Sequence, residues 1–252
     1  MQFEKLIAPM SVDEFAQSVN ANRSFVVRGD PNKFADLITL DDIERVLNNG
    51  CNTSVFPQII DGGVRYDLLD SELPWAPKAL KKSEFSRLLE DKRSFMMMNL
   101  SQINPKVSLL IDGVESAINS SCADLHLYVS SKAQATGYNA HRDRPQFKLY
   151  LQVIGSTRWC LYEAKSGLDN AVASIAKEEE EKYLTLKDEF DLNPGDMLFM
   201  PPATFHKVGN PYGPRVSFSI PFVVLNPEEK QPKKMDRSYI PFKSIFEKAQ
   251  RQ

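Results

Sequence analysis

Two histidines and one aspartate have the residue types and the spacing that could bind a metal ion. His141 and Asp143 stand two positions apart, so on an extended segment their side chains leave the same side of the backbone. His206 follows an apolar segment flanked by glycine and proline, a pattern typical of a short strand that ends in a turn. Two imidazoles and one carboxylate form the facial triad that holds non-haem Fe(II) and leaves positions open for a cosubstrate and oxygen. The three residues therefore predict an iron site.

Each histidine could also have a role that involves no metal ion. A surface H-x-D segment is commonplace, and His206 alone could be a hydrogen-bonded core histidine. The chain has only three histidines and two of them fall in this pattern, which favours the metal site. The third, His126, shares a predicted strand face with Tyr128 and Ser130 and could line a pocket, but we interpret it as a structural histidine.

The composition excludes one broad class of function. The 252 residues suffice for one large domain or two small ones, and 42% of them are hydrophobic. Proteins that bind nucleic acids usually carry a basic excess, whereas the formal net charge here is -2. We therefore expect no general affinity for DNA or RNA.

The cysteines and the N-terminal segment indicate the cellular compartment of the protein. Cys51, Cys122 and Cys160 are odd in number and show no C-x-x-C spacing, which argues against a disulfide framework and a thiolate zinc site. A reducing cytoplasm fits best. The first fifteen residues include acidic residues and a proline but no long apolar run, so we expect neither a signal peptide nor a membrane anchor.

The pattern of predicted elements changes along the chain. The N-terminal part predicts helices near 12–19, 41–47, 83–89 and 105–118 with short strands between them. Later, short β-branched or aromatic runs are separated by glycine, proline and asparagine, which is typical of an antiparallel sandwich or barrel. These runs are 125–130, 147–154, 158–162, 197–200 and 215–220. Residues 168–183 predict a helical or loose insertion, and the C-terminal segment is polar with a short helix around 242–246.

Three motifs in order resemble the JmjC and cupin-like 2-oxoglutarate oxygenases over roughly 125–222. They are the H-x-D segment, a strand with Gln152, Gly155 and Trp159, and a Pro-Gly-Asp strand ahead of His206. The resemblance implies a mainly β fold with flanking helices, a double-stranded β-helix of the jelly-roll, cupin-like type with an α/β N-terminal region. We expect residues 1–120 to pack on the barrel, 121–225 to form the catalytic core and 226–252 to form a short polar tail with a helix. Ribosomal oxygenases of this group often carry a C-terminal winged-helix domain, which we do not expect here.

The resemblance also implies cofactors and a reaction. His141, Asp143 and His206 would hold Fe(II), and 2-oxoglutarate would chelate that iron and be decarboxylated to succinate while a C–H bond is hydroxylated. The substrate would be a protein or peptide side chain. The alternatives are a free amino acid or other small metabolite, or a non-catalytic metal-binding cupin. Histone demethylation is less favoured because the sequence has no zinc-finger cysteine set.

One residue of the family pattern is missing. JmjC-type relatives usually place a basic anchor for the far carboxylate of 2-oxoglutarate two or three positions after the strand glycine, where this sequence has Thr157 and Arg158. Arg215 and Ser217 form an R-x-S pattern similar to the anchor of other 2-oxoglutarate oxygenases, and we favour this pair. Lys148 ranks second, because its period-2 partners could face the barrel interior.

Arg158 ranks third as the anchor, and both arginines could instead be surface charges near strand ends. Tyr138, beside the metal-binding segment, and Tyr128, on the strand of His126, are the remaining residues that we expect around the cosubstrate.

Overall fold

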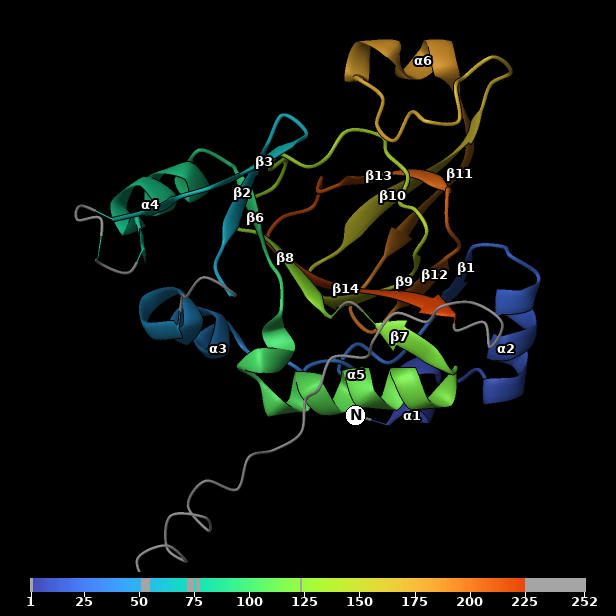
Figure 1. The fold of residues 1–252 in the computed structure, drawn as a ribbon, viewed down its shortest axis with the longest axis horizontal. Helices are drawn as coiled ribbons and strands as arrows, with labels where there is room; N and C mark the ends of the chain where they lie inside the picture. The colour runs from blue at the N-terminus through green and yellow to red at the C-terminus, as the bar shows by residue number, and fades with distance from the viewer. Residues whose placement is uncertain (1, 51–54, 72–74, 76–77, 123, 225–252) are drawn as a thin grey trace, which may run out of the picture.

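The computed structural model describes residues 2–50, 55–71, 75, 78–122 and 124–224, and these form a mainly β protein with flanking helices (Figure 1). A nine-stranded sheet has the order β1-β12-β9-β14-β8-β6-β2-β3, with β7 paired to β14. Its strands are β1 (Phe25–Val27), β2 (Gln58–Asp61), β3 (Val64–Asp67), β6 (Ser94–Met97), β7 (Ser120–Cys122), β8 (His126–Ser130), β9 (Phe147–Ile154), β12 (Met197–Met200) and β14 (Arg215–Val224).

A smaller sheet lies across from the large one. It contains β11 (Leu184–Leu192), β10 (Thr157–Ala164) and β13 (Phe205–Gly209), in that order, and a separate pair is formed by β4 (Leu69–Asp70) and β5 (Ala79–Leu80). All of these strand pairs are antiparallel. Two antiparallel sheets facing each other form the predicted double-stranded β-helix.

The helices lie mainly on the outside of the large sheet, and α1 and α5 run beneath it in Figure 1. They are α1 (Phe3–Ile7), α2 (Val12–Asn20), α3 (Leu40–Arg45), α4 (Lys82–Glu90), α5 (Pro105–Ala117) and α6 (Glu180–Tyr183), with 3-10 turns at Leu100–Gln102 and Lys177–Glu179 and a π turn at Val46–Gly50. A capping box between Ser11 and Glu14 starts α2 as the sequence predicts. No helix among the described residues is long and apolar enough to span a membrane.

Side chains of the central strand β9 alternate between two cores. Leu149 and Leu151 belong to the large core shared with the helices, whereas Tyr150 belongs to a smaller core between the two sheets. This alternation follows from the two-residue period of a strand. Lys148 and Gln152 therefore stand on the same inner face as Tyr150, and both are buried.

The N-terminal part does more than pack on the barrel, because β1, β2, β3 and β6 extend the large sheet itself. The division at residues 120 and 121 stays a prediction, and the predicted tail 226–252 lies outside the described residues. The insertion 168–183 contains only one 3-10 turn and the single-turn α6.

Two strands of the small sheet differ from the sequence-based expectation. The strand β11 was not predicted, because it is an edge strand whose central residues are mostly charged and exposed, so it lacks an alternating apolar pattern. His206 was expected at the turn that ends the preceding strand. It lies instead in a strand of its own, β13, which pairs with β10.

Candidate metal centre and adjoining pocket

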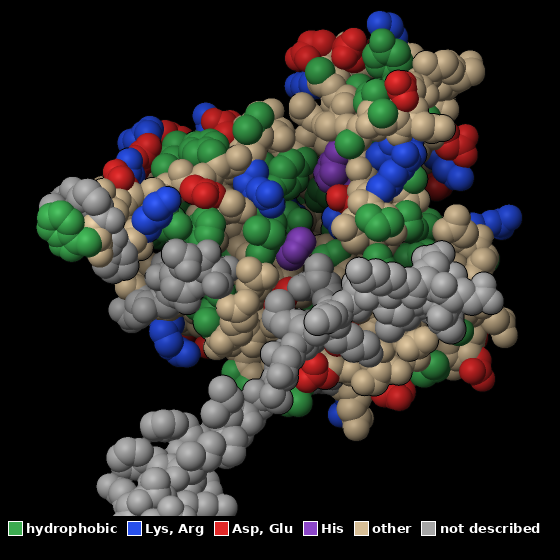
Figure 2. Space-filling model, viewed as in Figure 1, with side chains coloured by type: hydrophobic (Ala, Val, Ile, Leu, Met, Phe, Trp, Pro, Cys, Tyr) green, Lys and Arg blue, Asp and Glu red, His purple; other side chains and the backbone are tan. Residues whose placement is uncertain are grey.

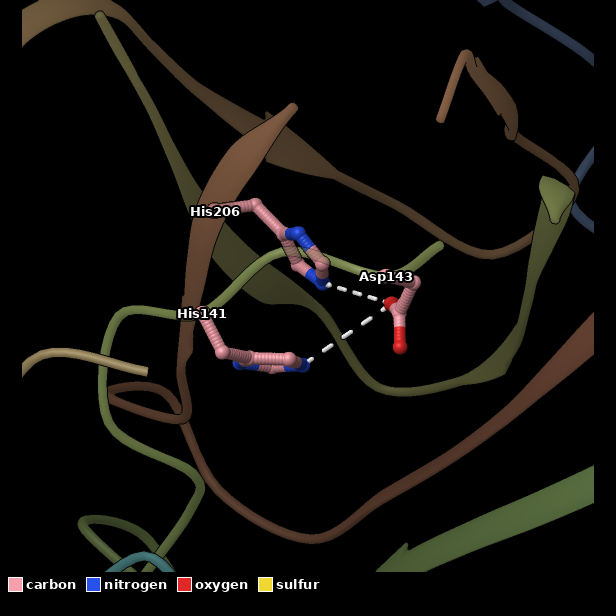
Figure 3. Close-up of side chains that lie close together, drawn as sticks. All are labelled: His141, Asp143 and His206. Carbon is pink, nitrogen blue, oxygen red and sulfur yellow. Dashed lines mark ion pairs between the residues drawn. The ribbon is translucent and has the colours of Figure 1, made fainter. Parts of the chain in front are cut away.

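The side chains of His141, Asp143 and His206 converge on one point (Figure 3), and their potential ligand atoms all lie within 4.8 Å of one another. Oδ2 of Asp143 is 4.0 Å from Nε2 of His141 and 3.8 Å from Nε2 of His206. The backbones of the two histidines hydrogen-bond to each other in both directions, at 3.0 and 2.8 Å. These bonds hold the two imidazoles side by side.

Each imidazole is oriented by a backbone carbonyl. Nδ1 of His141 lies 2.8 Å from the carbonyl oxygen of Asn139, and Nδ1 of His206 lies 3.1 Å from that of Thr204. A carbonyl oxygen only accepts, so Nδ1 carries the proton and Nε2 keeps its lone pair toward Asp143. Burial lowers the pKa of both imidazoles, that of His206 to about 3. Both side chains are therefore neutral at physiological pH, the form in which histidine binds metals.

Asp143 supplies the negative charge. Burial acts to raise the pKa of this carboxyl, but the positive charge of Lys148 and the hydrogen bond from its ammonium act against burial, and the pKa is lowered. Oδ2 is buried, and the ammonium of Lys148 lies 2.5 Å from it. A metal ion would satisfy this oxygen, and the donor set of two imidazole nitrogens and one carboxylate oxygen suits Fe(II).

A narrow pocket, of about 40 Å³, adjoins the cluster and lies between the two sheets. Figure 2 shows histidine side chains beside a hollow on this face of the molecule. Most of its wall is aromatic or apolar. The lining residues are Ile60, Tyr128, Gly137, Tyr138, His141, Tyr150, Trp159, His206, Val208, Arg215 and Ser217.

Arg215 brings a buried positive charge into this pocket. Its side chain donates to Oγ of Ser130 at 3.1 Å and to Oγ of Ser217 at 3.4 Å, and the residue is 7% exposed. Burial lowers its pKa to about 10, so it stays protonated at neutral pH. No carboxylate among the described residues forms an ion pair with Arg215. A buried cation without a counter-ion is costly, so this end of the pocket is suited to an anion.

The two lower-ranked basic residues occupy different places. Lys148 is buried, with Nζ 2.5 Å from Oδ2 of Asp143. Arg158 does not reach the pocket, which corrects its inclusion among the residues around the cosubstrate. Its Nε lies 3.0 Å from Oδ1 of Asp191, because side chains alternate along β10 and the neighbouring Trp159 occupies the inner face.

Two aromatic residues on the inner faces contact His206. Trp159 is buried in the core between the sheets and stacks on the His206 ring with 5.8 Å between centroids and 18° between planes. The hydroxyl of Tyr150 lies 3.3 Å from Nε2 of His206. The alternation of Tyr150 with Lys148 along one strand was the signal that could have identified it. Tyr128 and Tyr138 both line the pocket.

The insertion 168–183 is tied to both segments that carry the His-Asp-His cluster. Arg142, between His141 and Asp143, donates from its guanidinium to the carbonyls of Asp169, Asn170 and Val172. Lys207, next to His206, forms an ion pair with Glu180 of α6 at 2.7 Å. The insertion therefore braces the cluster from outside.

The fold and the site define a cupin-like double-stranded β-helix protein with a His-Asp-His cluster. A family model described as a JmjC domain matches residues 98–229, slightly more than half of the chain. The protein belongs to the JmjC domain family. This confirms the family expected from the motifs.

The structural comparisons agree with that assignment. The X-ray structure of Escherichia coli ycfD aligns with a TM-score of 0.59 at 14% sequence identity, over 95% of this chain and 66% of that one. A structure of Escherichia coli YcfD described as a ribosomal oxygenase in complex with cobalt and 2-oxoglutarate gives 0.51 at 15% identity, over 90% and 62%. Such identities establish the fold alone, and this chain spans less than two thirds of either chain. No curated protein sequence matches it.

Proposed function

We propose that the protein is an Fe(II)- and 2-oxoglutarate-dependent dioxygenase that hydroxylates a C–H bond. His141, Asp143 and His206 would hold the iron, and Arg215 with Ser217 would bind the far carboxylate of 2-oxoglutarate. When bound, iron and 2-oxoglutarate supply an oxidative decarboxylation that yields succinate and CO2 and inserts one oxygen atom into the substrate. The protein's own residues orient these groups in a largely apolar pocket.

One observation carries this proposal: the buried Arg215, without a carboxylate partner among the described residues, lines the same pocket as the three-residue cluster. A dicarboxylate can bind a metal at one end and a guanidinium at the other, and two parallel hydrogen bonds strengthen the second contact. This also favours an oxygenase over a cupin that only binds metal, which has no need of the buried cation.

Arg215 is a better anchor than Lys148 for a structural reason. The ammonium of Lys148 already lies against Asp143, whereas the partners of the Arg215 guanidinium among the described residues are the hydroxyls of Ser130 and Ser217. Ser217 in turn donates to Oε1 of Gln152 at 2.8 Å. These neutral contacts fix the guanidinium without neutralising its charge.

The substrate that we propose is a protein or peptide side chain, and the protein partner would present it at the pocket. The support is the likeness to structures described as ribosomal oxygenases. The alternative, a free amino acid or another small metabolite, would use the same residues.

The reaction is tested by incubating the iron-loaded protein with 2-oxoglutarate in air and following succinate by NMR. Slow succinate formation is expected from the protein alone, and faster formation is expected when a pool of peptides contains the substrate. Mass spectrometry then identifies the peptide that gains one oxygen atom. No succinate in the presence of peptide and metabolite pools would contradict the proposal.

A further inference from the structure

Arg65 stands at the margin of the pocket because of the strand register. It lies in β3, the edge strand of the large sheet, directly opposite Ile60 of β2. Side chains of directly opposed residues in an antiparallel pair project from the same face. Ile60 lines the pocket, so Arg65 projects from the pocket side of the hairpin. Figure 2 shows basic side chains beside the hollow.

The β2–β3 hairpin is packed against the segment that leads to His141. Gly63 has a φ of +83°, and a Cβ there would lie 2.7 Å from Nδ2 of Asn139. The hydroxyl of Thr136 donates to the carbonyl of Ile60. These contacts place the hairpin, and Arg65 with it, in a defined position relative to the metal-binding segment.

The guanidinium of Arg65 contacts sulfur atoms and not a carboxylate. Nη1 lies 3.6 Å from Sδ of Met96 and 3.8 Å from Sδ of Met98. A thioether is only a weak acceptor and carries no charge. No described carboxylate forms an ion pair with Arg65, which leaves its charge available to a ligand.

The acidic residues of the hairpin are engaged elsewhere. Asp61 forms an ion pair with Arg93 at 2.9 Å, and Asp67 accepts from Nε2 of Gln58 at 2.5 Å. Neither carboxylate is therefore committed to Arg65.

The charges near the pocket are predominantly positive. Burial lowers the pKa of His126 and raises those of Tyr128 and Tyr138. The charged side chains close enough to add to these shifts are three cations, Arg65, Lys148 and Arg215, and one acid, Asp143. Lys148 lies against that acid, and the proposed function assigns Arg215 to 2-oxoglutarate. Of these three described cations, Arg65 is the one without an assigned partner.

We propose that Arg65 binds a carboxylate of the substrate, so that the molecule presented to the metal centre carries an anionic group near the C–H bond that reacts. This inference rests on the proposed function and names the class of its substrate. The same Met96 sulfur that contacts Arg65 also lies 3.1 Å from the hydroxyl of the pocket residue Tyr138. A substrate carboxylate at Arg65 would therefore sit beside the pocket wall, with the rest of the molecule extending inward.

The test compares pairs of probes that differ in one carboxylate. Wild-type, Arg65→Met and Arg65→Lys proteins are loaded anaerobically with Mn(II) and saturating 2-oxoglutarate, and both loading steps are followed by calorimetry. Ligand-observed NMR then measures the binding of short N-acetylated, C-amidated peptides that contain Asp or Glu (the acids) and of the matching peptides with Asn or Gln (the amides). The matched control is Arg87→Met, because Arg87 is an exposed arginine of α4 paired with Asp91 at 3.0 Å.

The wild-type protein should bind the acids about tenfold more tightly than the amides, as expected for an arginine–carboxylate contact that is partly exposed. Arg65→Met should lose this preference, Arg65→Lys should keep part of it and Arg87→Met should keep all of it. Equal binding of acids and amides by the wild type, no binding of either, or an unchanged preference in Arg65→Met would overturn the inference. Calorimetry shows before any probe is added whether the protein binds Mn(II) and 2-oxoglutarate. If it binds neither, the proposed function is overturned, and this inference with it.

Discussion

The ammonium of Lys148 lies 2.5 Å from Oδ2 of Asp143, the same carboxylate oxygen that faces both histidines of the cluster. A metal ion at the cluster would take up this oxygen. Two cations cannot share it without repulsion, so Lys148 and a bound metal ion would compete for Asp143. Lys148 therefore acts as the counter-charge of Asp143 when no metal is bound.

Replacing Lys148 by Met should strengthen metal binding. The change removes a positive charge beside the site, and the affinity for Mn(II), measured by calorimetry, should rise by roughly tenfold. The matched control is Lys187→Met, because Lys187 is an exposed lysine paired with Glu163. Weaker Mn(II) binding would show that Lys148 positions Asp143, and a strong loss of 2-oxoglutarate binding would make Lys148 the anchor.

Breaking the ion pair between Lys207 and Glu180 should weaken metal binding at the His-Asp-His cluster, although neither residue belongs to the cluster. The pair is mostly buried, and it holds the insertion whose Ile175 backbone hydrogen-bonds to Ala140, next to His141. Glu180→Gln should lower the Mn(II) affinity about threefold to tenfold without removing a ligand. Glu179→Gln, at the neighbouring exposed position, should have no effect. Equal affinities in the two variants would rule out the bracing role.

Burial of His126 should make the protein less stable in mild acid. Burial first, and then the charges of Lys148 and Arg65, lower its pKa from 6.5 to about 4. Because the folded-state pKa is the lower one, the unfolded chain binds the proton more readily, and stability present above pH 6.5 is lost as the pH falls toward 4. His141 and His206 have lowered pKa values too and act in the same direction.

The contribution of His126 can be isolated with His126→Gln. The free energy of unfolding, measured with urea, should decrease between pH 7.5 and pH 5.5. This decrease should be about 1 kcal/mol smaller in the variant than in the wild type. An identical decrease in both proteins would mean that the half-buried His126 is not a neutral group with a lowered pKa.

The sequence predicted that His141, Asp143 and His206 lie together because their arrangement depends on local rules. His141 and Asp143 follow the two-residue period of an extended segment, and the order of motifs identified the barrel strands. Arg158 was misplaced although the same period applies, since its neighbour Trp159 takes the inner face. That alternation would have excluded Arg158.

Other features depend on pairing across distant strands, which no local pattern reveals. The place of Arg65 follows from its register with Ile60, and the bracing ion pair joins α6 to β13. The edge strand β11 lacks a buried face to produce a pattern. The boundary at residue 120 and the cytoplasmic location stay predictions.

We propose that one end of 2-oxoglutarate binds a metal held by His141, Asp143 and His206. Its other end binds the guanidinium of Arg215. Anaerobic calorimetry with Mn(II), followed by 2-oxoglutarate, tests it in the wild type and in the Asp143→Ala, Arg215→Met and Arg158→Met proteins. Asp143→Ala should lose tight Mn(II) binding, because the only anionic ligand is gone. Arg215→Met should bind Mn(II) normally but 2-oxoglutarate about 30-fold or more weakly, whereas Arg158→Met should match the wild type. Unchanged Mn(II) affinity in Asp143→Ala, or 2-oxoglutarate affinity within about threefold of the wild type in Arg215→Met, would contradict the account.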